Sequence, residues 1–249
     1  MFEDDDDDEV AVKKPPTPYW GIIGTLAFTF GIFLAFGVTW EIGASFVTEA
    51  GFHRDDFGGL HFMAGYTTGM IGGLAFMVML IRIRRTVSVA DYLDLRRPPI
   101  GATLLCLVIM GAVVALVQAA GAAMDLDMVY APVRDNLATA LIPLLYVLVT
   151  ALVVPVFDTA FFQGFLLKGL AESRLGMHGA AAISTLVWTV MQIPSATITR
   201  NFDVASLQTI EFLLVGALLA YARLRWKSLI LCGIVCSAWN LITLFIASR

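Results

Sequence analysis

Polar side chains that could take part in chemistry lie inside apolar stretches of the C-terminal half of the chain. A charged or amide group inside a lipid bilayer is costly, so each one is expected to have a structural or functional role. Cys236 and Asn240 are four residues apart and therefore share one face of a helix. Asp158 and Gln163 are five apart and do not fully face one direction. The candidate residues are Asp158, Gln163, Gln192, Glu211, Cys236, Ser237 and Asn240.

The segments that hold these residues are predicted to be transmembrane helices. Hydrophobic residues make up 59% of the 249-residue chain and charged residues 14%, whereas a soluble domain carries about 25% charged residues. A span needs roughly 20 mostly apolar residues. Seven stretches qualify, at about 19–41, 59–81, 100–123, 136–156, 178–194, 205–222 and 228–247. The predicted fold class is therefore all-α, a polytopic transmembrane helical bundle.

An eighth apolar segment, residues 157–172, contains Asp158, Gln163 and Lys168. We predict that it is a half-buried continuation of the fourth span on the cytoplasmic side. Glu211 lies inside the sixth span, with Gln208 one turn away, and is predicted to make an interhelical hydrogen bond because a carboxyl group in lipid needs a partner.

The chain divides into three predicted regions. Residues 1–18 carry five consecutive aspartates and three prolines, which indicates an acidic, disordered cytoplasmic tail. Residues 19–87 are predicted to form an N-terminal transmembrane hairpin, whose glycines follow the small-xxx-small spacing that lets helices approach closely. Residues 88–247 are predicted to form a second transmembrane domain. It begins with a short interfacial helix over residues 88–95, which two prolines terminate.

Basic residues set the predicted orientation, because they remain on the cytoplasmic side. We expect the chain to lie in a bacterial cytoplasmic (inner) membrane, with the N-terminus in the cytoplasm and the C-terminus outside. Of the 16 lysines and arginines, the ones that fall on the outer side of the predicted spans are Arg54, Arg134, Arg200 and Arg249.

The three cysteines, Cys106, Cys232 and Cys236, all lie in apolar spans and form no CxxC metal motif. We expect them to pack as small apolar side chains. No cofactor, no metal site and no nucleic-acid partner is expected. The expected partners are the lipid bilayer and other membrane proteins.

Three short patterns in successive predicted helices carry most of the polar candidates. The first is Pro155-Val-Phe-Asp158-Thr159-Ala-Phe-Phe162-Gln163-Gly164, the second is Trp188-Thr-Val-Met-Gln192-Ile-Pro194, and the third ends in Cys236-Ser-Ala-Trp-Asn240. In frame, order and spacing, the three together resemble the CAAX-protease and bacteriocin-processing family of intramembrane proteases. The resemblance covers about residues 88–247.

This resemblance implies that the catalytic side chains of the family are largely replaced. The family carries two glutamates and an arginine in the first pattern, and the chain has Asp158 and Thr159 in place of the glutamates. Gln163 stands in place of the arginine. Gln192 and Cys236 stand in place of the histidines of the second and third patterns.

The family is taken to hydrolyse peptide bonds by activating a water molecule, and the replacements remove most of the groups for that reaction. Gln192 cannot act as a base near neutral pH, and Cys236 is a soft, poor donor. Asp158 keeps a carboxylate that is one methylene shorter, and Asn240 retains the family side chain. Losing one such group commonly lowers the rate by about 10² to 10⁴. The chain is therefore expected to be catalytically inactive.

Three functions remain open. The first is a non-catalytic scaffold, regulatory or accessory subunit of a membrane complex. The second is a divergent, active intramembrane endopeptidase that uses Asp158 and Asn240. The third is a small transporter or lipid-binding subunit, which the sequence disfavours because transporters pair broken helices in corresponding halves. Under the family resemblance, four polar side chains should meet in one cavity open toward the cytoplasm: Asp158, Gln163, Gln192 and Asn240.

Overall fold

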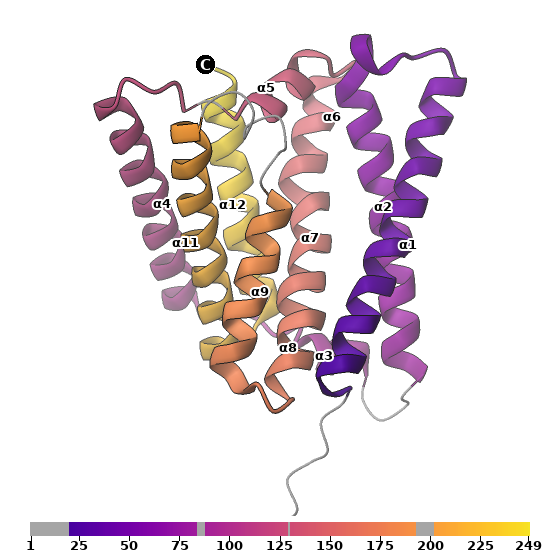
Figure 1. Cartoon of the computed structure of the whole chain (residues 1–249), viewed down its shortest axis with the longest axis vertical. Helices are drawn as coiled ribbons and strands as arrows, with labels where there is room; N and C mark the ends of the chain where they lie inside the picture. Colours follow the sequence, from indigo (N-terminus) through magenta and orange to yellow (C-terminus); the bar gives the residue numbers. More distant parts are fainter. Residues whose placement is uncertain (1–19, 84–87, 129, 193–201) are drawn as a thin grey trace, which may run out of the picture.

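The computed structural model describes residues 20–83, 88–128, 130–192 and 202–249, and these residues form helices and turns without a strand. Six helical segments are long and apolar enough to cross a membrane (Figure 1). They are Gly21–Glu49, Gly58–Ile83, Ile100–Ala123, Pro143–Ala171, Phe202–Trp226 and Leu229–Ala247. The protein is thus an all-α polytopic bundle, as its composition predicts. The acidic tail predicted over residues 1–18 lies outside the described residues.

Helices α1 (Gly21–Glu49) and α2 (Arg54–Ile83) form the N-terminal hairpin and lie at one side of the bundle (Figure 1). Three glycines of α2, Gly65, Gly69 and Gly72, face α1. A Cβ atom at Gly65 would meet the Trp40 ring, and one at Gly69 would meet the Phe36 ring. The close approach of the two backbones therefore depends on the small-residue spacing that the sequence shows.

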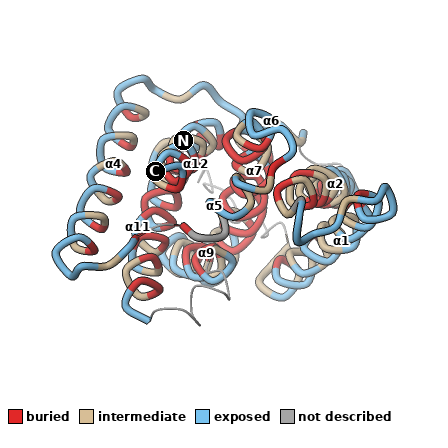
Figure 2. Tube along the Cα trace, turned by 90° about the horizontal axis from the view of Figure 1, so that it is seen from above, coloured by how far each residue is buried: buried red, intermediate tan, exposed pale blue. Residues whose placement is uncertain are grey.

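Large apolar side chains face outward from the bundle, where the surrounding solvent is lipid. Ile23 on α1 is 85% exposed and Leu116 on α4 (Ile100–Ala123) is 71% exposed. Figure 2 shows that buried residues line the inner faces of the helices and exposed residues the outer faces. Such side chains would be unfavourable in water over so large a surface, so these helices contact the bilayer.

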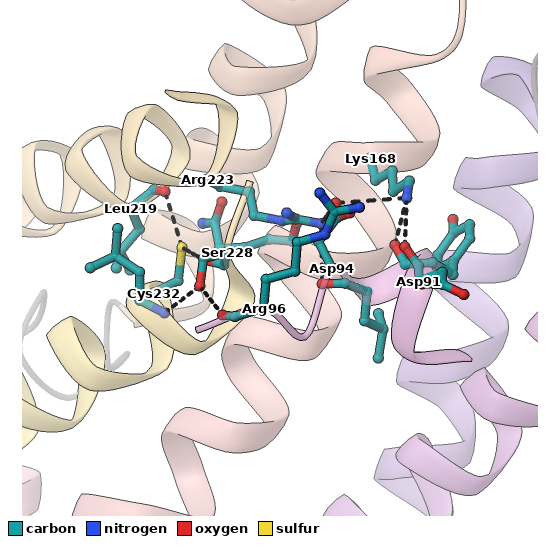
Figure 3. A network of polar contacts seen from close by, with 12 residues as sticks. Asp91, Asp94, Arg96, Lys168, Leu219, Arg223, Ser228 and Cys232 are labelled. Atoms are coloured by element: carbon teal, nitrogen blue, oxygen red, sulfur yellow. Dashed lines mark hydrogen bonds and ion pairs between the residues drawn. The ribbon is translucent and has the colours of Figure 1, made fainter. Parts of the chain in front are cut away.

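A buried ion pair fixes the short helix α3 (Val89–Leu93) against the C-terminal helices (Figure 3). The guanidinium of Arg223 is 2.8 Å from a carboxylate oxygen of Asp94, and the Arg223 side chain is 3% exposed. Its Nε also donates to the carbonyl of Gln163 at 3.0 Å. Lys168 donates to the carbonyl of Tyr92 at 2.7 Å. One end of the bundle is therefore held by polar contacts among three segments far apart in the sequence.

One continuous helical run, Pro143–Ala171, carries the first sequence pattern. It consists of α6 (Pro143–Leu148), the π-helical turns η1 (Val149–Val153), α7 (Val154–Asp158), the π-helical turns η2 (Thr159–Leu166) and α8 (Leu167–Ala171). Proline normally breaks a helix because it lacks an N–H group. Here the π-helical turns on both sides of Pro155 let the helix continue through it.

The prediction that residues 157–172 continue the fourth span is confirmed, whereas the prediction that this segment is only half-buried needs correction. The two parts are one helix, and every residue of η2 is buried. The physical reason is that polar groups at this depth have no water to contact, so the helix carries them inside the bundle.

Helices α9 (Gly176–Gln192), α11 (Phe202–Trp226) and α12 (Leu229–Ala247) complete the bundle. The predicted fifth span corresponds to α9, whose 17 described residues leave it just below the length of the six spanning segments. It nevertheless runs from the α8 end of the bundle toward the α5 end (Figure 1). The start of α1 and the C-terminus lie at opposite ends of the bundle in the same view.

Candidate functional site

A cavity of about 380 Å³, here called the central cavity, lies inside the bundle between the N-terminal hairpin and α7, α9, α11 and α12. Its wall is mainly apolar and includes seven phenylalanines. These are Phe33, Phe36, Phe62, Phe157, Phe161, Phe162 and Phe212. Cavities of this size and lining are typical of sites for small ligands, at the lower end of their range.

Asp158, at the end of α7, is the acidic group of the central cavity. Its side chain is buried, and each of its carboxylate oxygens accepts a hydrogen bond. Tyr66 on α2 donates its hydroxyl to one oxygen at 2.5 Å, and Gln192 on α9 donates its amide to the other at 3.2 Å. Three helices therefore converge on one carboxylate. Tyr66 was not among the predicted site residues, because it belongs to the N-terminal hairpin, 92 positions from Asp158.

Asn240, on α12, lies on the same cavity and stabilises the irregular part of the first helix. Its amide donates to the carbonyl of Thr150 at 2.8 Å. In the π-helical register of η1, the N–H of Val154 bonds to the carbonyl of Val149. The next donor in that register would be Pro155, which has no N–H. Asn240 therefore supplies the hydrogen bond that the Thr150 carbonyl cannot receive from its own helix.

The other candidate residues do not line the central cavity. Thr159 donates its hydroxyl to the carbonyl of Pro155 at 2.6 Å. Gln163 is 1% exposed, and its side-chain amide has no hydrogen-bond partner among the described residues. Cys236 is fully buried in the apolar core and does not line the cavity. The structure thus brings Asp158, Gln192 and Asn240 together on one cavity.

The cavity extends toward the α5 end of the bundle rather than toward the end that carries α3. Its lining includes Tyr130, which precedes α5 (Ala131–Ala138), and Val133 and Asn136 on α5 itself. At the α3 end the interior is filled by fully buried side chains such as Phe165 and Leu170. The prediction that the cavity opens toward the cytoplasmic end, where the basic residues gather, therefore disagrees with the residues that line it.

A second buried carboxyl group, that of Glu211 on α11, lies behind the cavity wall. Tyr130 donates its hydroxyl to both Glu211 oxygens at 2.6 Å, and the indole N–H of Trp239 donates to Oε1 at 2.9 Å. This confirms the predicted interhelical hydrogen bond. Burial, together with the Glu211 carboxylate, raises the pKa of Tyr130 above its ordinary value, so its hydroxyl stays protonated as the donor.

The donor set of the site is poor in metal ligands. Within the described part of the chain, no group of three or more His, Cys, Asp or Glu side chains is placed to hold a metal ion. The cysteines of α12, Cys232 and Cys236, are both free and buried. Cys232 instead directs its thiol to the carbonyl of Leu219 at 3.5 Å.

Residues 140–242 match a known protein family, described as type II CAAX prenyl endopeptidase Rce1-like. The match begins just before α6 and ends in α12, so it contains Asp158, Gln192 and Asn240 and excludes the N-terminal hairpin. No curated protein and no solved structure matches the chain.

Proposed function

We propose that this chain, which carries a type II CAAX prenyl endopeptidase Rce1-like domain over residues 140–242, is a non-catalytic member of the family. We further propose that it acts as a scaffold, regulatory or accessory subunit of a membrane complex. The observation that carries the proposal is the environment of Asp158. Its two oxygens are both engaged, and the donors that engage them are a phenol and an amide.

Water activation needs a base that can take a proton near neutral pH and a positioned partner that passes it on. Gln192 lies where the family has a histidine, and an amide does not accept protons near neutral pH. Cys236 lies where the family has a second histidine. It is buried and does not line the central cavity. Each such loss lowers a rate by about 10² to 10⁴, so the combined loss leaves little hydrolysis.

Binding is the property that these replacements leave in place. The central cavity keeps an apolar, largely aromatic wall and a few polar groups that fix orientation, as ligand sites do. The outer surface of the spanning helices offers the apolar area on which other membrane proteins could assemble. Partners of this kind, together with lipid, are the ones that we propose.

One observation favours the alternative of a divergent, active endopeptidase. Asp158 and Asn240, the two polar groups that such an enzyme would use, both line the central cavity. The cleavage experiment below separates the two functions directly.

The protein in liposomes is expected to release no peptide products above background from a broad peptide library, with or without added zinc, as read by mass spectrometry. The reason is the lack of a working base beside Asp158. Asp158→Ala serves as the control. A variant with Asp158→Glu, Thr159→Glu, Gln192→His and Cys236→His restores the side chains of the family for comparison. If the natural protein cleaves peptides and Asp158→Ala abolishes this cleavage, the hypothesis of an active endopeptidase is right.

We also propose that the chain lies in a bacterial cytoplasmic membrane with its N-terminus in the cytoplasm. Reporter fusions after Arg97 and Arg225 are expected to give a cytoplasmic signal, and a fusion near Arg54 an external one, because the basic loops remain inside. Alkaline phosphatase and green fluorescent protein fusions in cells measure this. An external signal after Arg97 would overturn the orientation.

A further inference from the structure

Helices α9 and α11 enclose a second hollow, here called the α9–α11 groove, on the outer surface of the bundle. Where the two helices are closest, a Cβ atom at Gly216 would meet the side chains of Trp188 and Thr185. Toward the α8 end the groove has a volume of about 610 Å³ and shares no lining residue with the central cavity. Its floor is made of small side chains, those of Ala181, Ala182, Ala217 and Ala220.

The walls of the groove are larger side chains that face the bilayer. Met177 and Leu186 on α9 and Tyr221 on α11 line the groove and are each more than half exposed. From Met177 to Leu186 the groove follows α9 for about 13 Å, at 1.5 Å per residue. One leaflet of the hydrocarbon core is roughly 15 Å thick. The groove therefore has the length and the apolar lining that suit one acyl chain of a single leaflet.

Two basic side chains, those of Arg225 and His178, lie at the α8 end of the groove. Both are exposed, and within the described parts of the chain neither makes a hydrogen bond or an ion pair. Arg223 and Lys168, in contrast, are paired with Asp94. No acidic side chain lines the groove among the described residues. The mouth of the groove thus carries a positive charge for which the protein supplies no counter-charge.

Two aromatic rings place this mouth at the depth of the lipid headgroups. The Tyr221 ring packs edge-to-face against Trp226, with ring centroids 5.7 Å apart. Tyrosine and tryptophan gather at the interface between membrane and water, and α11 ends at Trp226. Arg225 therefore lies where the headgroup of a lipid meets the start of its acyl chains.

The charge decides among the molecules that could cover the groove. In a symmetric dimer the same surface meets itself, which would bring the two copies of Arg225 together without a counter-charge. A lipid with no net charge would fill the apolar floor but leave the guanidinium unpaired. An anionic phospholipid supplies both parts, because its phosphate oxygens accept paired hydrogen bonds from a guanidinium. The His178 ring adds an N–H donor in either protonation state.

We propose that the α9–α11 groove binds an anionic phospholipid of the bilayer. One acyl chain lies along the alanines of the floor, and the phosphate is held by Arg225 and His178. The inference goes beyond the proposed function, because neither the central cavity nor Asp158 takes part in this site.

The test uses the full chain in phosphatidylcholine nanodiscs that contain a small fraction of a phospholipid probe with a diazirine in one acyl chain. The headgroup of the probe is either phosphatidylglycerol or phosphatidylcholine. After illumination, mass spectrometry measures adducts on pepsin peptides that cover residues 177–186 and 217–225. The phosphatidylglycerol probe is expected to label these peptides about five times more than the phosphatidylcholine probe, the effect of one basic residue at the membrane surface.

Substitutions separate the headgroup contact from the chain contact. Arg225→Gln removes the charge and is expected to bring the ratio between the two probes close to one, and His178→Gln is expected to lower it about twofold. The matched control is Arg82→Gln, because Arg82 on α2 is exposed at the same end of the bundle but outside the groove. It is expected to leave the ratio unchanged. Ala217→Phe fills the floor and is expected to lower phosphatidylglycerol labelling of residues 177–186 several-fold.

In detergent micelles without phospholipid, Arg225→Gln and His178→Gln are expected to unfold at the same concentration of sodium dodecyl sulfate as the natural protein. The reason is that the lipid, and not the fold, uses these two exposed side chains. A loss of labelling in nanodiscs by a variant with natural stability therefore reports on lipid binding.

Four results would overturn the inference. A ratio near one for the natural protein would mean that the headgroup is not recognised, and an equal fall for Arg82→Gln and Arg225→Gln would mean a general attraction to this end of the bundle. Displacement of the probe by millimolar inorganic phosphate would indicate an anion site without an acyl chain. A disulfide between two copies of the Ala217→Cys variant in nanodiscs would mean that a second copy covers the groove. None of these readouts depends on peptide cleavage, so the inference and the proposed function can fail independently.

Discussion

Replacing Arg223 with alanine is expected to lower the free energy of unfolding by about 3–5 kcal/mol, the usual effect of removing one partner of a buried ion pair. The guanidinium contacts the Asp94 carboxylate at 2.8 Å and donates to the carbonyls of Gln163 and Leu93. All three acceptors lose the hydrogen bond from Arg223, and Asp94 keeps only its longer ion pairs with Lys168 and Arg96, at 3.8 and 3.9 Å. Unfolding by sodium dodecyl sulfate in mixed micelles, followed by circular dichroism, measures the change.

The same helix provides a matched control at Arg225, which is exposed two residues further along. Arg225→Ala is expected to change the free energy of unfolding by no more than about 0.5 kcal/mol, as surface substitutions usually do. Arg223→Lys keeps the charge but not the planar set of donors, so an intermediate loss is expected. Equal effects of Arg223→Ala and Arg225→Ala would contradict the role given to the buried pair.

Composition and charge were sufficient to predict the membrane bundle, but they could not distinguish these two arginines. In the sequence both belong to one basic cluster, Arg223 to Lys227, at one end of a predicted span. What sets Arg223 apart is the turn after α3, where Asp94 adopts a left-handed backbone conformation, φ 49°, and directs its carboxylate inward. Contacts between segments so distant in the chain leave no periodic signal in the sequence.

The candidate site was predicted in part, and Gln163 is the residue that was misplaced. The order and spacing of the three sequence patterns correctly predicted that Asp158, Gln192 and Asn240 lie on one cavity. The family resemblance alone placed Gln163 in this cavity, because five residues of α-helix turn it away from Asp158. The structure buries Gln163 in η2 outside the cavity lining. A π-helical turn beside a proline cannot be recognised from residue types alone.

The hydrogen-bond donors to Asp158 and Glu211 also could not be predicted from the sequence. Tyr66 and Tyr130 each donate a hydroxyl to one of these carboxylates, yet neither lies in a recognisable pattern. The only available signal is physical: a carboxyl group inside a bilayer requires a donor. That rule correctly predicted an interhelical hydrogen bond for Glu211 and gave no indication of which residue would supply it.

Replacing Glu211 with leucine is expected to lower the free energy of unfolding by about 2–6 kcal/mol. The substitution removes the acceptor shared by the Tyr130 hydroxyl and the Trp239 indole N–H, which are 2.6 and 2.9 Å from the carboxylate. Each buried donor left without an acceptor costs about 1–3 kcal/mol. The same titration with sodium dodecyl sulfate measures the loss.

Glu211→Gln keeps one acceptor oxygen at the same position, so it is expected to lose less stability than Glu211→Leu. A double-mutant cycle isolates the cause. Tyr130→Phe, which removes only the hydroxyl, should destabilise the natural protein more than it destabilises Glu211→Leu, because in that variant the hydroxyl has already lost its acceptor. If the effects of Tyr130→Phe and Glu211→Leu simply add, the hydrogen bond between them does not stabilise the wall. The loss would then come from the Trp239 hydrogen bond and from side-chain packing, and Glu211 would have no part in positioning the Tyr130 ring.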